Sequence, residues 1–210
     1  MLLKNYFYYF KKAFSKKFCE DVIQLGESKQ RKIALVGGGS QRDEVRFPLD
    51  KSELKNLRKT RDSNISWLSE PWVYKRILPY IHEANKRAGW NFEWQSPEAC
   101  QFTKYDKGQY YDWHCDSNPE PYKNGSQKGK IRKLSVTISL SDSSKYKGGN
   151  LQFAYRNKMP TKKEKIYTCK EILEQGSIII FPSFVWHKVS PVTKGTRYSL
   201  VVWNVGEPFR

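Results

Sequence analysis

Apolar residues in the first part of the chain recur with helical spacing in two segments. The segment 15–26 starts at Ser15, a residue type that caps helix N-termini, and has one apolar side formed by Phe18, Val22, Ile23 and Leu25. The segment 71–88 starts at Pro71, which the first turn of a helix tolerates, and Gly89 follows it. Its apolar stripe consists of Val73, Ile77, Leu78 and Ile81. The pattern predicts two amphipathic helices, preceded by an aromatic strand over 6–10.

From about residue 90 onward the pattern changes to short strands separated by turns. The expected strands are 93–94, 99–105, 134–140, 151–155, 177–181 and 198–204. Turn signals lie between them at 106–109, 124–125, 147–149 and 193–195. Many short strands at this spacing are typical of a β-sandwich or jelly roll. We therefore expect an α+β protein with a double-stranded β-helix (jelly roll) core and supporting N-terminal helices. It would be a single domain over 1–210, with 1–90 mainly helical support and 91–210 the catalytic core.

Composition is that of a folded chain and excludes several classes of protein. The chain is 38% hydrophobic, 15% aromatic and 28% charged. Its densest apolar run, 178–181, is far shorter than the roughly 18 residues of a membrane span, so no membrane association is expected. The first ten residues contain Lys4 and no small-residue cleavage site, which argues against a signal peptide and favours a cytoplasmic location. The stretch 37–40 lacks the Lys-Ser/Thr ending of a phosphate-binding loop and is expected to be a flexible loop.

Four scattered cysteines and a large positive charge leave the choice of partner open. Cys19, Cys100, Cys115 and Cys169 form no CxxC pair, so we expect reduced thiols rather than a zinc cluster or a disulfide framework. The formal net charge of +17 could attract nucleic acid, an acidic membrane surface or an acidic polypeptide. Lysine is, however, spread along the whole chain, and a general solubilising role is the simpler explanation of the charge.

Two of the three histidines lie in a pattern that suits a metal. His114 and Asp116 form a His-X-Asp pair, and on a strand their side chains would point to the same face. His187 would come from a distant strand, and two imidazoles with one carboxylate are the ligand set of non-heme Fe(II) oxygenases. Arg197, ten positions after His187, offers a rigid fork for a carboxylate. The third histidine, His82, lies on the predicted helix 71–88 and is expected to pack there or face solvent.

The order of motifs around these residues resembles the Fe(II)- and 2-oxoglutarate-dependent oxygenases, and within them the prolyl 4-hydroxylase-like branch. The resemblance covers roughly 100–205, and its combined pattern is specific although each motif alone is weak. The motifs are Tyr105-X-X-Gly108-Gln109-X-Tyr111-X-X-His114-X-Asp116, Leu134 to Asp142, Gly148-Gly149-Asn150-Leu151-X-Phe153, Gly176-Ser177-X-X-X-Phe181-Pro182, His187, Val189, Gly195-Thr196-Arg197 and Trp203. Asn150 stands where the branch usually has Glu, and we assign it no chemistry.

The resemblance implies both a site and a reaction. His114, Asp116 and His187 would hold Fe(II), Arg197 would bind the distal carboxylate of 2-oxoglutarate, and Tyr105 would also reach that cosubstrate. O₂ would be the co-reactant, ascorbate an accessory ligand, and succinate and CO₂ the co-products. The expected reaction is hydroxylation of a C–H bond, inherited from the branch as a prolyl residue of a peptide or protein.

Two other functions compete with protein hydroxylation. Oxidative demethylation of nucleic acid would suit the charge, but related demethylases carry a second arginine six residues after the cosubstrate arginine, where this chain has Trp203. A catalytically silent basic jelly-roll binding module would have no need of the full set of His114, Asp116, His187 and Arg197.

Two loops, 117–130 and 157–165, are candidate lids over the site. The aromatic residues Tyr111, Trp113, Tyr122 and Trp186 would either line a substrate groove or pack in the core.

Overall fold

The computed structural model describes residues 3–29, 32–33, 51–155, 159–161 and 166–209 of the 210-residue chain. The expected loop at 37–40 and most of the expected lid at 157–165 lie outside these residues. Within the described part, the helices are α1 (Lys16–Ser28), α2 (Lys51–Thr60), α3 (Pro71–Arg87) and the short 3-10 helix η2 (Ser143–Lys145).

A large sheet forms the base of the fold. Its strands run in the order β1, β12, β8, β15, β6, β4, β2, and β5 pairs with β15 outside this path. Their bounds are β1 (Tyr8–Phe10), β2 (Lys32–Ile33), β4 (Asn64–Leu68), β5 (Ser96–Pro97), β6 (Cys100–Tyr105), β8 (Ile131–Ser139), β12 (Ile178–Pro182) and β15 (Arg197–Gly206). The N-terminal part thus supplies β1, which was expected within 6–10, and also β2 and β4, which were not expected.

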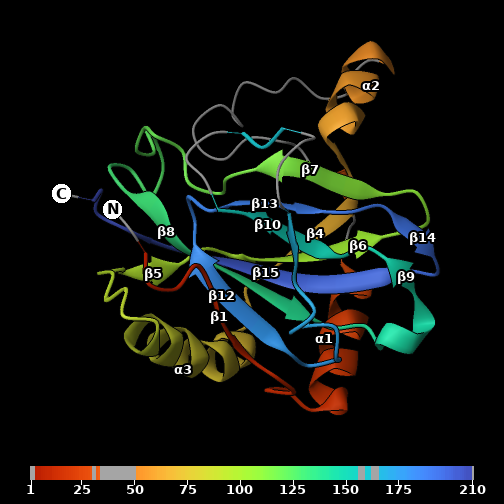
Figure 1. Cartoon of the computed structure of the whole chain (residues 1–210), viewed down its shortest axis with the longest axis horizontal. Coiled ribbons are helices and arrows are strands. Elements are labelled where there is room, and N and C mark those ends of the chain that lie inside the picture. Colours follow the sequence, from red (N-terminus) through yellow and green to blue (C-terminus); the bar gives the residue numbers. More distant parts are fainter. Residues whose placement is uncertain (1–2, 30–31, 34–50, 156–158, 162–165, 210) are drawn as a thin grey trace.

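A smaller sheet faces the large one. It runs in the order β11, β10, β13, β7, β3, and a two-stranded ribbon joins β14 to β9. Their bounds are β3 (Arg61–Asp62), β7 (Tyr110–His114), β9 (Lys147–Gly148), β10 (Leu151–Ala154), β11 (Tyr167–Thr168), β13 (Trp186–Val189) and β14 (Val192–Lys194). In Figure 1, β7, β13 and β10 lie above β15 and β12. This arrangement confirms the jelly-roll core.

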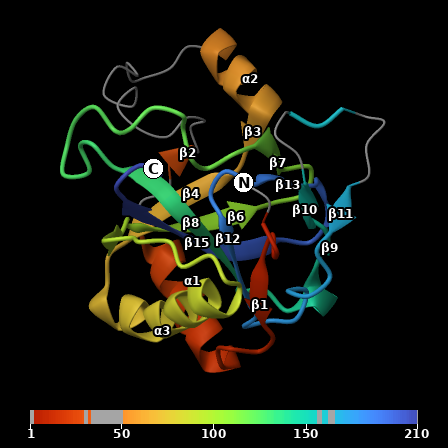
Figure 2. The same ribbon diagram turned by 60° about the vertical axis from the view of Figure 1, so that its left-hand side comes forward.

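Strict alternation divides the large sheet into a helix-facing side and a cavity-facing side. In β8, Leu134, Val136 and Ile138 pack with the helices, whereas Ser135 and Thr137 point to the other face. Strand β15 repeats the pattern: Leu200 and Val202 belong to the helix-side core. The helices α1 and α3 lie together against that side of the sheet in both views (Figures 1 and 2). The opposite, partly polar face is therefore free to line a site between the two sheets.

Both predicted helices are present and start as expected, but α1 continues two residues past the predicted end at Gly26, to Ser28. Ser15 caps α1 by accepting a hydrogen bond from the Phe18 backbone N–H at 3.2 Å. Pro71 lies at the start of α3, and Gly89, just after its end, has the positive φ of 73° that glycine adopts easily. Helix α2 was not predicted, because its sequence, KSELKNLRKT, is mostly polar and has only a weak apolar pattern.

The strand expected over 93–94 was wrong. Those residues form no strand, and the pairing begins two residues later, where β5 lies antiparallel to the end of β15 with Ser96 opposite Val205. The Gln95 backbone N–H donates to the Val205 carbonyl at 2.7 Å, which attaches the preceding loop to the sheet edge. The other expected strands are present, with ends shifted by up to three residues.

Helix α1 is held close to the large sheet by a glycine. Gly26 is buried, and a Cβ added there would overlap the ring of Phe102 on β6. In an exposed helix the change from glycine to alanine stabilises by up to about 1 kcal/mol, but overpacking a filled core destabilises by about 1–3 kcal/mol. We therefore expect Gly26→Ala to lower the free energy of unfolding, measured by urea denaturation. The exposed Gln24→Ala on the same helix is the control, with an expected change within about 0.5 kcal/mol. A gain in stability for Gly26→Ala would contradict this packing.

In the described part of the chain, no helix combines the length and the apolar character that crossing a bilayer requires. All four cysteines are free thiols, and Cys19, Cys100 and Cys169 are buried. The expectation of unpaired cysteines is confirmed.

Candidate functional site

His114 and His187 lie side by side on neighbouring strands of the small sheet. They are paired in the register of β7 with β13, and their ring centroids are 4.1 Å apart. His114 Nδ1 lies 2.8 Å from the Asp112 carbonyl oxygen, and His187 Nδ1 lies 2.9 Å from the Val185 carbonyl oxygen. Because a carbonyl can only accept, each Nδ1 carries a hydrogen, and in the neutral form of such a ring Nε2 holds the free lone pair. Such backbone contacts are the usual way of orienting a metal-ligating imidazole.

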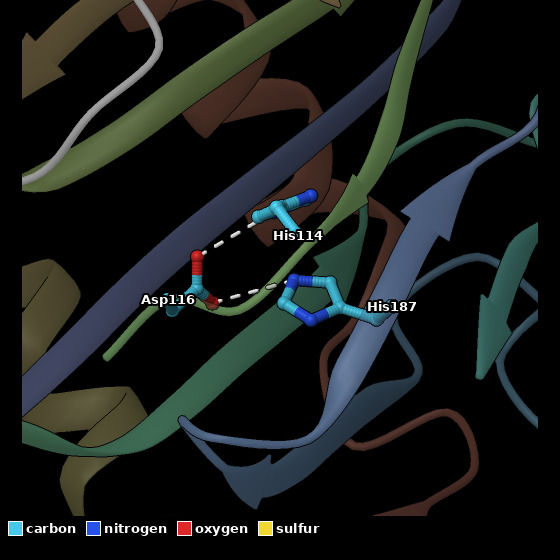
Figure 3. A group of neighbouring side chains, drawn as sticks. All are labelled: His114, Asp116 and His187. Atoms are coloured by element: carbon cyan, nitrogen blue, oxygen red, sulfur yellow. Dashed lines mark ion pairs between the residues drawn. The ribbon is translucent and has the colours of Figure 1, made fainter. Parts of the chain in front are cut away.

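Asp116 completes the group from just beyond the end of β7. The prediction placed it on the same strand face as His114, but the strand ends at His114 and Asp116 lies in the following bend. The backbone N–H groups of Asp116 and Ser117 both donate to the Ser183 carbonyl, which fixes the bend against the segment before His187. The two carboxylate oxygens lie 3.6 Å from His114 Nε2 and 3.4 Å from His187 Nε2 (Figure 3).

Burial and mutual contact set the charges of these groups. Burial, reinforced by His114, lowers the pKa of His187 to about 4, so this imidazole is neutral at pH 7. For Asp116, burial alone would raise the pKa, but His187 and His114 outweigh it and hold the pKa far below the usual range. The carboxylate is therefore ionised. A neutral imidazole and a carboxylate are the protonation states that metal ligation needs.

The three side chains fit a divalent metal. Their ligand atoms all lie within 4.8 Å of one another, and no other group of three or more such residues occurs in the described part of the chain. Two imidazole nitrogens and one carboxylate oxygen suit Fe(II) and leave coordination positions open for other ligands. The expected set of His114, Asp116 and His187 is thus brought together as the sequence suggested.

Arg197 and Tyr105 form the other end of the site. They are directly opposite each other in the pairing of β15 with β6, and both are buried. The guanidinium carbon lies 5.5 Å from the centre of the Tyr105 ring, and Arg197 Nη1 donates to Ser199 Oγ at 3.3 Å. Gly149 leaves room for this arginine, because a Cβ there would approach Arg197 Cδ to 2.8 Å. A buried guanidinium without an acidic partner among the described residues suits a carboxylate ligand.

One narrow cavity joins the two ends. Its walls include both histidines, Asp116, Tyr105 and Arg197. The other lining residues are Arg61, Gln101, Tyr111, Thr137, Leu151, Val189, Ser199, Val201 and Trp203. The Arg197 guanidinium and the three candidate metal ligands therefore line one and the same cavity.

Sequence reasoning missed Arg61, a second buried arginine in this cavity. Arg61 lies on the two-residue strand β3 and donates from Nε to Ser63 Oγ at 3.0 Å. Its guanidinium lies 4.4 Å from the centre of the Tyr111 ring, which in turn stacks on the His114 ring at 3.5 Å. Burial raises the pKa of Tyr111 to about 12. The sequence did not indicate a role for Arg61, because this arginine belongs to no motif and follows a helix that the apolar pattern did not predict.

An ion pair lies against Trp203, one of the residues that line the cavity. Arg132 Nη2 lies 2.6 Å from Glu98 Oε2, and the Tyr122 hydroxyl donates to Glu98 Oε1. The Arg132 guanidinium lies 3.8 Å from the centre of the Trp203 ring. Burial alone would lower the pKa of Arg132, but Glu98 outweighs it and raises the pKa above its ordinary value. The pair is therefore charged, and it fixes one face of the indole.

The remaining sequence candidates lie around the site in different roles. Of the four aromatic residues, Tyr111 lines the cavity, Tyr122 bonds Glu98, and Trp113 lies under the Lys188 ammonium. Trp186 is half-buried and does not line the cavity. His82 packs on Trp94, with ring centroids 4.7 Å apart, as a helix-packing residue. The Asn150 backbone exchanges hydrogen bonds with Ser190, and its side chain has no assigned role.

Comparison with known proteins identifies the family. The model of the 2OG-Fe(II) oxygenase superfamily matches residues 100–205. A PKHD-type hydroxylase of Pseudoalteromonas atlantica is 33% identical over 104 residues, which is 49% of this chain and 41% of the relative. The matched stretch thus spans about two fifths of that protein.

Solved structures confirm the fold at low sequence identity. The viral collagen prolyl hydroxylase of Paramecium Bursaria Chlorella virus-1 aligns over 97% of both chains with a TM-score of 0.62 and 15% identity. A prolyl hydroxylase from Trichoplax adhaerens, in complex with a hypoxia inducible factor peptide fragment, covers 96% of this chain and 84% of its own. Its TM-score is 0.56 and its identity 17%. With the metal-binding geometry and the family match in agreement, the chain belongs to the 2OG-Fe(II) oxygenase superfamily.

Proposed function

We propose that this protein is an Fe(II)- and 2-oxoglutarate-dependent dioxygenase that hydroxylates a C–H bond, on a prolyl residue of a peptide or protein. The observation that carries the proposal is the buried group of His114, Asp116 and His187 in one cavity with Arg197. Family membership supports the cofactors, because this superfamily is named for 2-oxoglutarate and Fe(II).

Each residue has a defined task in this proposal. His114, Asp116 and His187 hold Fe(II), and the backbone carbonyls on the two Nδ1 atoms keep both Nε2 lone pairs directed at it. Arg197 binds the distal carboxylate of 2-oxoglutarate, with the Tyr105 ring beside it. When bound, the iron supplies the redox chemistry by which O₂ and 2-oxoglutarate give succinate, CO₂ and a hydroxylated product. The buried walls exclude water, and ascorbate would serve as an accessory reductant.

The prolyl substrate is supported by the relatives. The two structural neighbours named above are prolyl hydroxylases, and one of them was solved with a peptide. These two neighbours are 15% and 17% identical in sequence to this chain. The prolyl substrate is therefore tested directly on the protein itself.

The test is a product analysis. The Fe(II)-loaded protein would be incubated with 2-oxoglutarate, O₂, ascorbate and a panel of proline-rich peptides, and products would be sequenced by mass spectrometry. We expect a gain of one oxygen on proline in at least one peptide, with succinate formed in equal amount. The same peptides with proline replaced by alanine are the control. Succinate formed equally with both sets, and no oxygen on proline, would contradict a prolyl substrate.

Nucleic-acid demethylation is the competing activity. It would need a cation six residues after Arg197, but Trp203 occupies that position and is covered by Arg132. Methylated single-stranded DNA in the same assay is expected to give no formaldehyde, and formaldehyde release would favour the competing activity.

A further inference from the structure

Two polar atoms in the wall of the cavity have no partner. Gln101 Oε1 and Trp203 Nε1 are both buried and make no hydrogen bond in the described structure. Their residues are 2% and 4% exposed, and both line the cavity that contains the metal group. Buried polar side-chain atoms are nearly always paired in folded proteins, so an unpaired indole N–H and an unpaired amide oxygen in one cavity point to a ligand.

Gln101 can offer either a donor or an acceptor to that ligand. Its Nε2 lies 3.0 Å from Thr103 Oγ1, and the Thr103 hydroxyl can both donate and accept. Rotating the amide by half a turn would let the hydroxyl donate to Oε1 and would free Nε2–H. The indole of Trp203 can only donate. A ligand with two acceptor oxygens would therefore satisfy both side chains, with Thr103 remaining bonded to the amide.

The two side chains lie toward the metal end of the cavity. Gln101 is opposite Val201 in the pairing of β6 with β15, and Trp203 lies two residues further along β15 on the same face. Trp203 is also paired with Ser135, whose Oγ lies 2.9 Å from Ser183 Oγ. Ser183 is the residue that anchors the Asp116 backbone. Trp203 thus lies on the Asp116 side of the cavity, whereas Arg197 lies at the opposite end of the same strand face.

Charge favours an anion as the occupant. Among the described lining residues, Arg61 and Arg197 are cationic and Asp116 is the one carboxylate. A divalent metal adds two positive charges. The Arg132 guanidinium stacked on Trp203 makes its N–H a better donor to a negative group. A carboxylate fits both the charge and the need for two acceptor oxygens.

Resting on the proposed function, we infer that Gln101 and Trp203 form a neutral carboxylate subsite that holds the metal-proximal 1-carboxylate of the 2-oxo acid cosubstrate. Arg197 takes the distal carboxylate, so the two ends of a dicarboxylate are recognised by different chemistry. A charged guanidinium fixes the distal end, and an amide with an indole N–H orients the end beside the metal.

Two substitutions of Gln101 test this inference. Gln101→Met removes the amide at similar length, and Gln101→Glu places a negative charge beside the inferred carboxylate. Binding of 2-oxoglutarate to the Mn(II)-loaded protein would be measured by calorimetry. We expect about a tenfold weaker Kd for Gln101→Met and at least about a hundredfold weaker Kd for Gln101→Glu, because like charges repel strongly in a buried site. Trp203→Phe, which loses the N–H, is expected to weaken binding about tenfold.

Gln152 provides a matched control. Its Nε2 donates to Thr168 Oγ1 at 2.9 Å, the same kind of contact as that of Gln101, but it does not line the cavity. Gln152→Glu and Gln152→Met should leave the Kd unchanged. Mn(II) affinity, measured by electron paramagnetic resonance, is expected to stay within about twofold in all variants, which shows that the metal group is intact.

A second ligand locates the contact on the cosubstrate. Levulinate keeps the keto group and the distal carboxylate of 2-oxoglutarate but has a methyl group in place of the 1-carboxylate. Gln101→Glu should therefore leave levulinate binding, measured by ligand-observed NMR, nearly unchanged. Equal loss of both ligands, or wild-type 2-oxoglutarate affinity in Gln101→Glu and Trp203→Phe, would overturn the subsite while leaving the proposed function standing. A wild-type protein that binds no 2-oxoglutarate would refute the proposed function and the subsite together.

Discussion

Asp116→Ala is expected to lower the affinity for Fe(II) by more than about a hundredfold, since even the loss of an outer-shell partner costs about 10–100-fold. Asp116 is the one carboxylate of the group, with one oxygen 3.6 Å from His114 Nε2 and the other 3.4 Å from His187 Nε2. Without it, two imidazoles and no anionic ligand would remain to hold a doubly charged ion in a buried site. The affinity would be measured anaerobically by competition with a chromogenic chelator.

Asp142→Ala is the control for this loss. Asp142 caps the short helix η2 by accepting from the Ser144 backbone N–H, and it does not line the cavity. Its Fe(II) affinity should equal that of the wild type. Thermal unfolding of the apo forms would show that Asp116→Ala is still folded. Full Fe(II) affinity in a folded Asp116→Ala protein would mean that the ion binds elsewhere.

Arg197→Ala is expected to weaken 2-oxoglutarate by about a hundredfold, equivalent to about 2.7 kcal/mol, with Fe(II) affinity nearly unchanged. The guanidinium is buried opposite Tyr105, and it can donate two parallel charge-assisted hydrogen bonds to a carboxylate. Arg197→Lys keeps the charge but loses the planar fork, so we expect an intermediate loss. Calorimetric titration of the Mn(II)-loaded protein would give both affinities.

The exposed Arg58 on helix α2 supplies the matched control. Arg58→Ala changes the net charge by the same amount, so any general effect of charge on anion binding appears in both variants. Equal weakening in the two would contradict a direct contact of Arg197 with the cosubstrate. A parallel loss of metal and cosubstrate in Arg197→Ala would show instead that the arginine maintains the structure of the metal group.

The metal group was predictable because its residues are rare and lie in ordered motifs. His114, Asp116 and His187 were assigned from residue type and spacing, and the structure brings all three together. The geometry of Asp116 was not predictable, since the end of β7 and the anchor on the Ser183 carbonyl depend on a segment far away in the chain. Alternation along β8 and β15 indicated strands, but it did not tell which face would line a cavity.

Residues of the cavity wall were harder to foresee. Arg61 lies on a two-residue strand with no periodic pattern, and Gln101 is one polar position in a strand. Arg61 is buried in the cavity wall, and the buried Oε1 atom of Gln101 has no hydrogen-bond partner; both are properties of the folded chain. Trp203 was noticed for its spacing from Arg197, whereas its unpaired N–H and its contact with Arg132 became visible in three dimensions.

The most direct test of the central claim is O₂ uptake by the purified protein, with succinate measured in the same samples. The account predicts uptake that requires both Fe(II) and 2-oxoglutarate in the wild type, forms one succinate per O₂ consumed, and is absent in His187→Ala. A folded wild-type protein that binds Fe(II) but shows no uptake dependent on 2-oxoglutarate would contradict the account. Equal uptake by His187→Ala would contradict it as well.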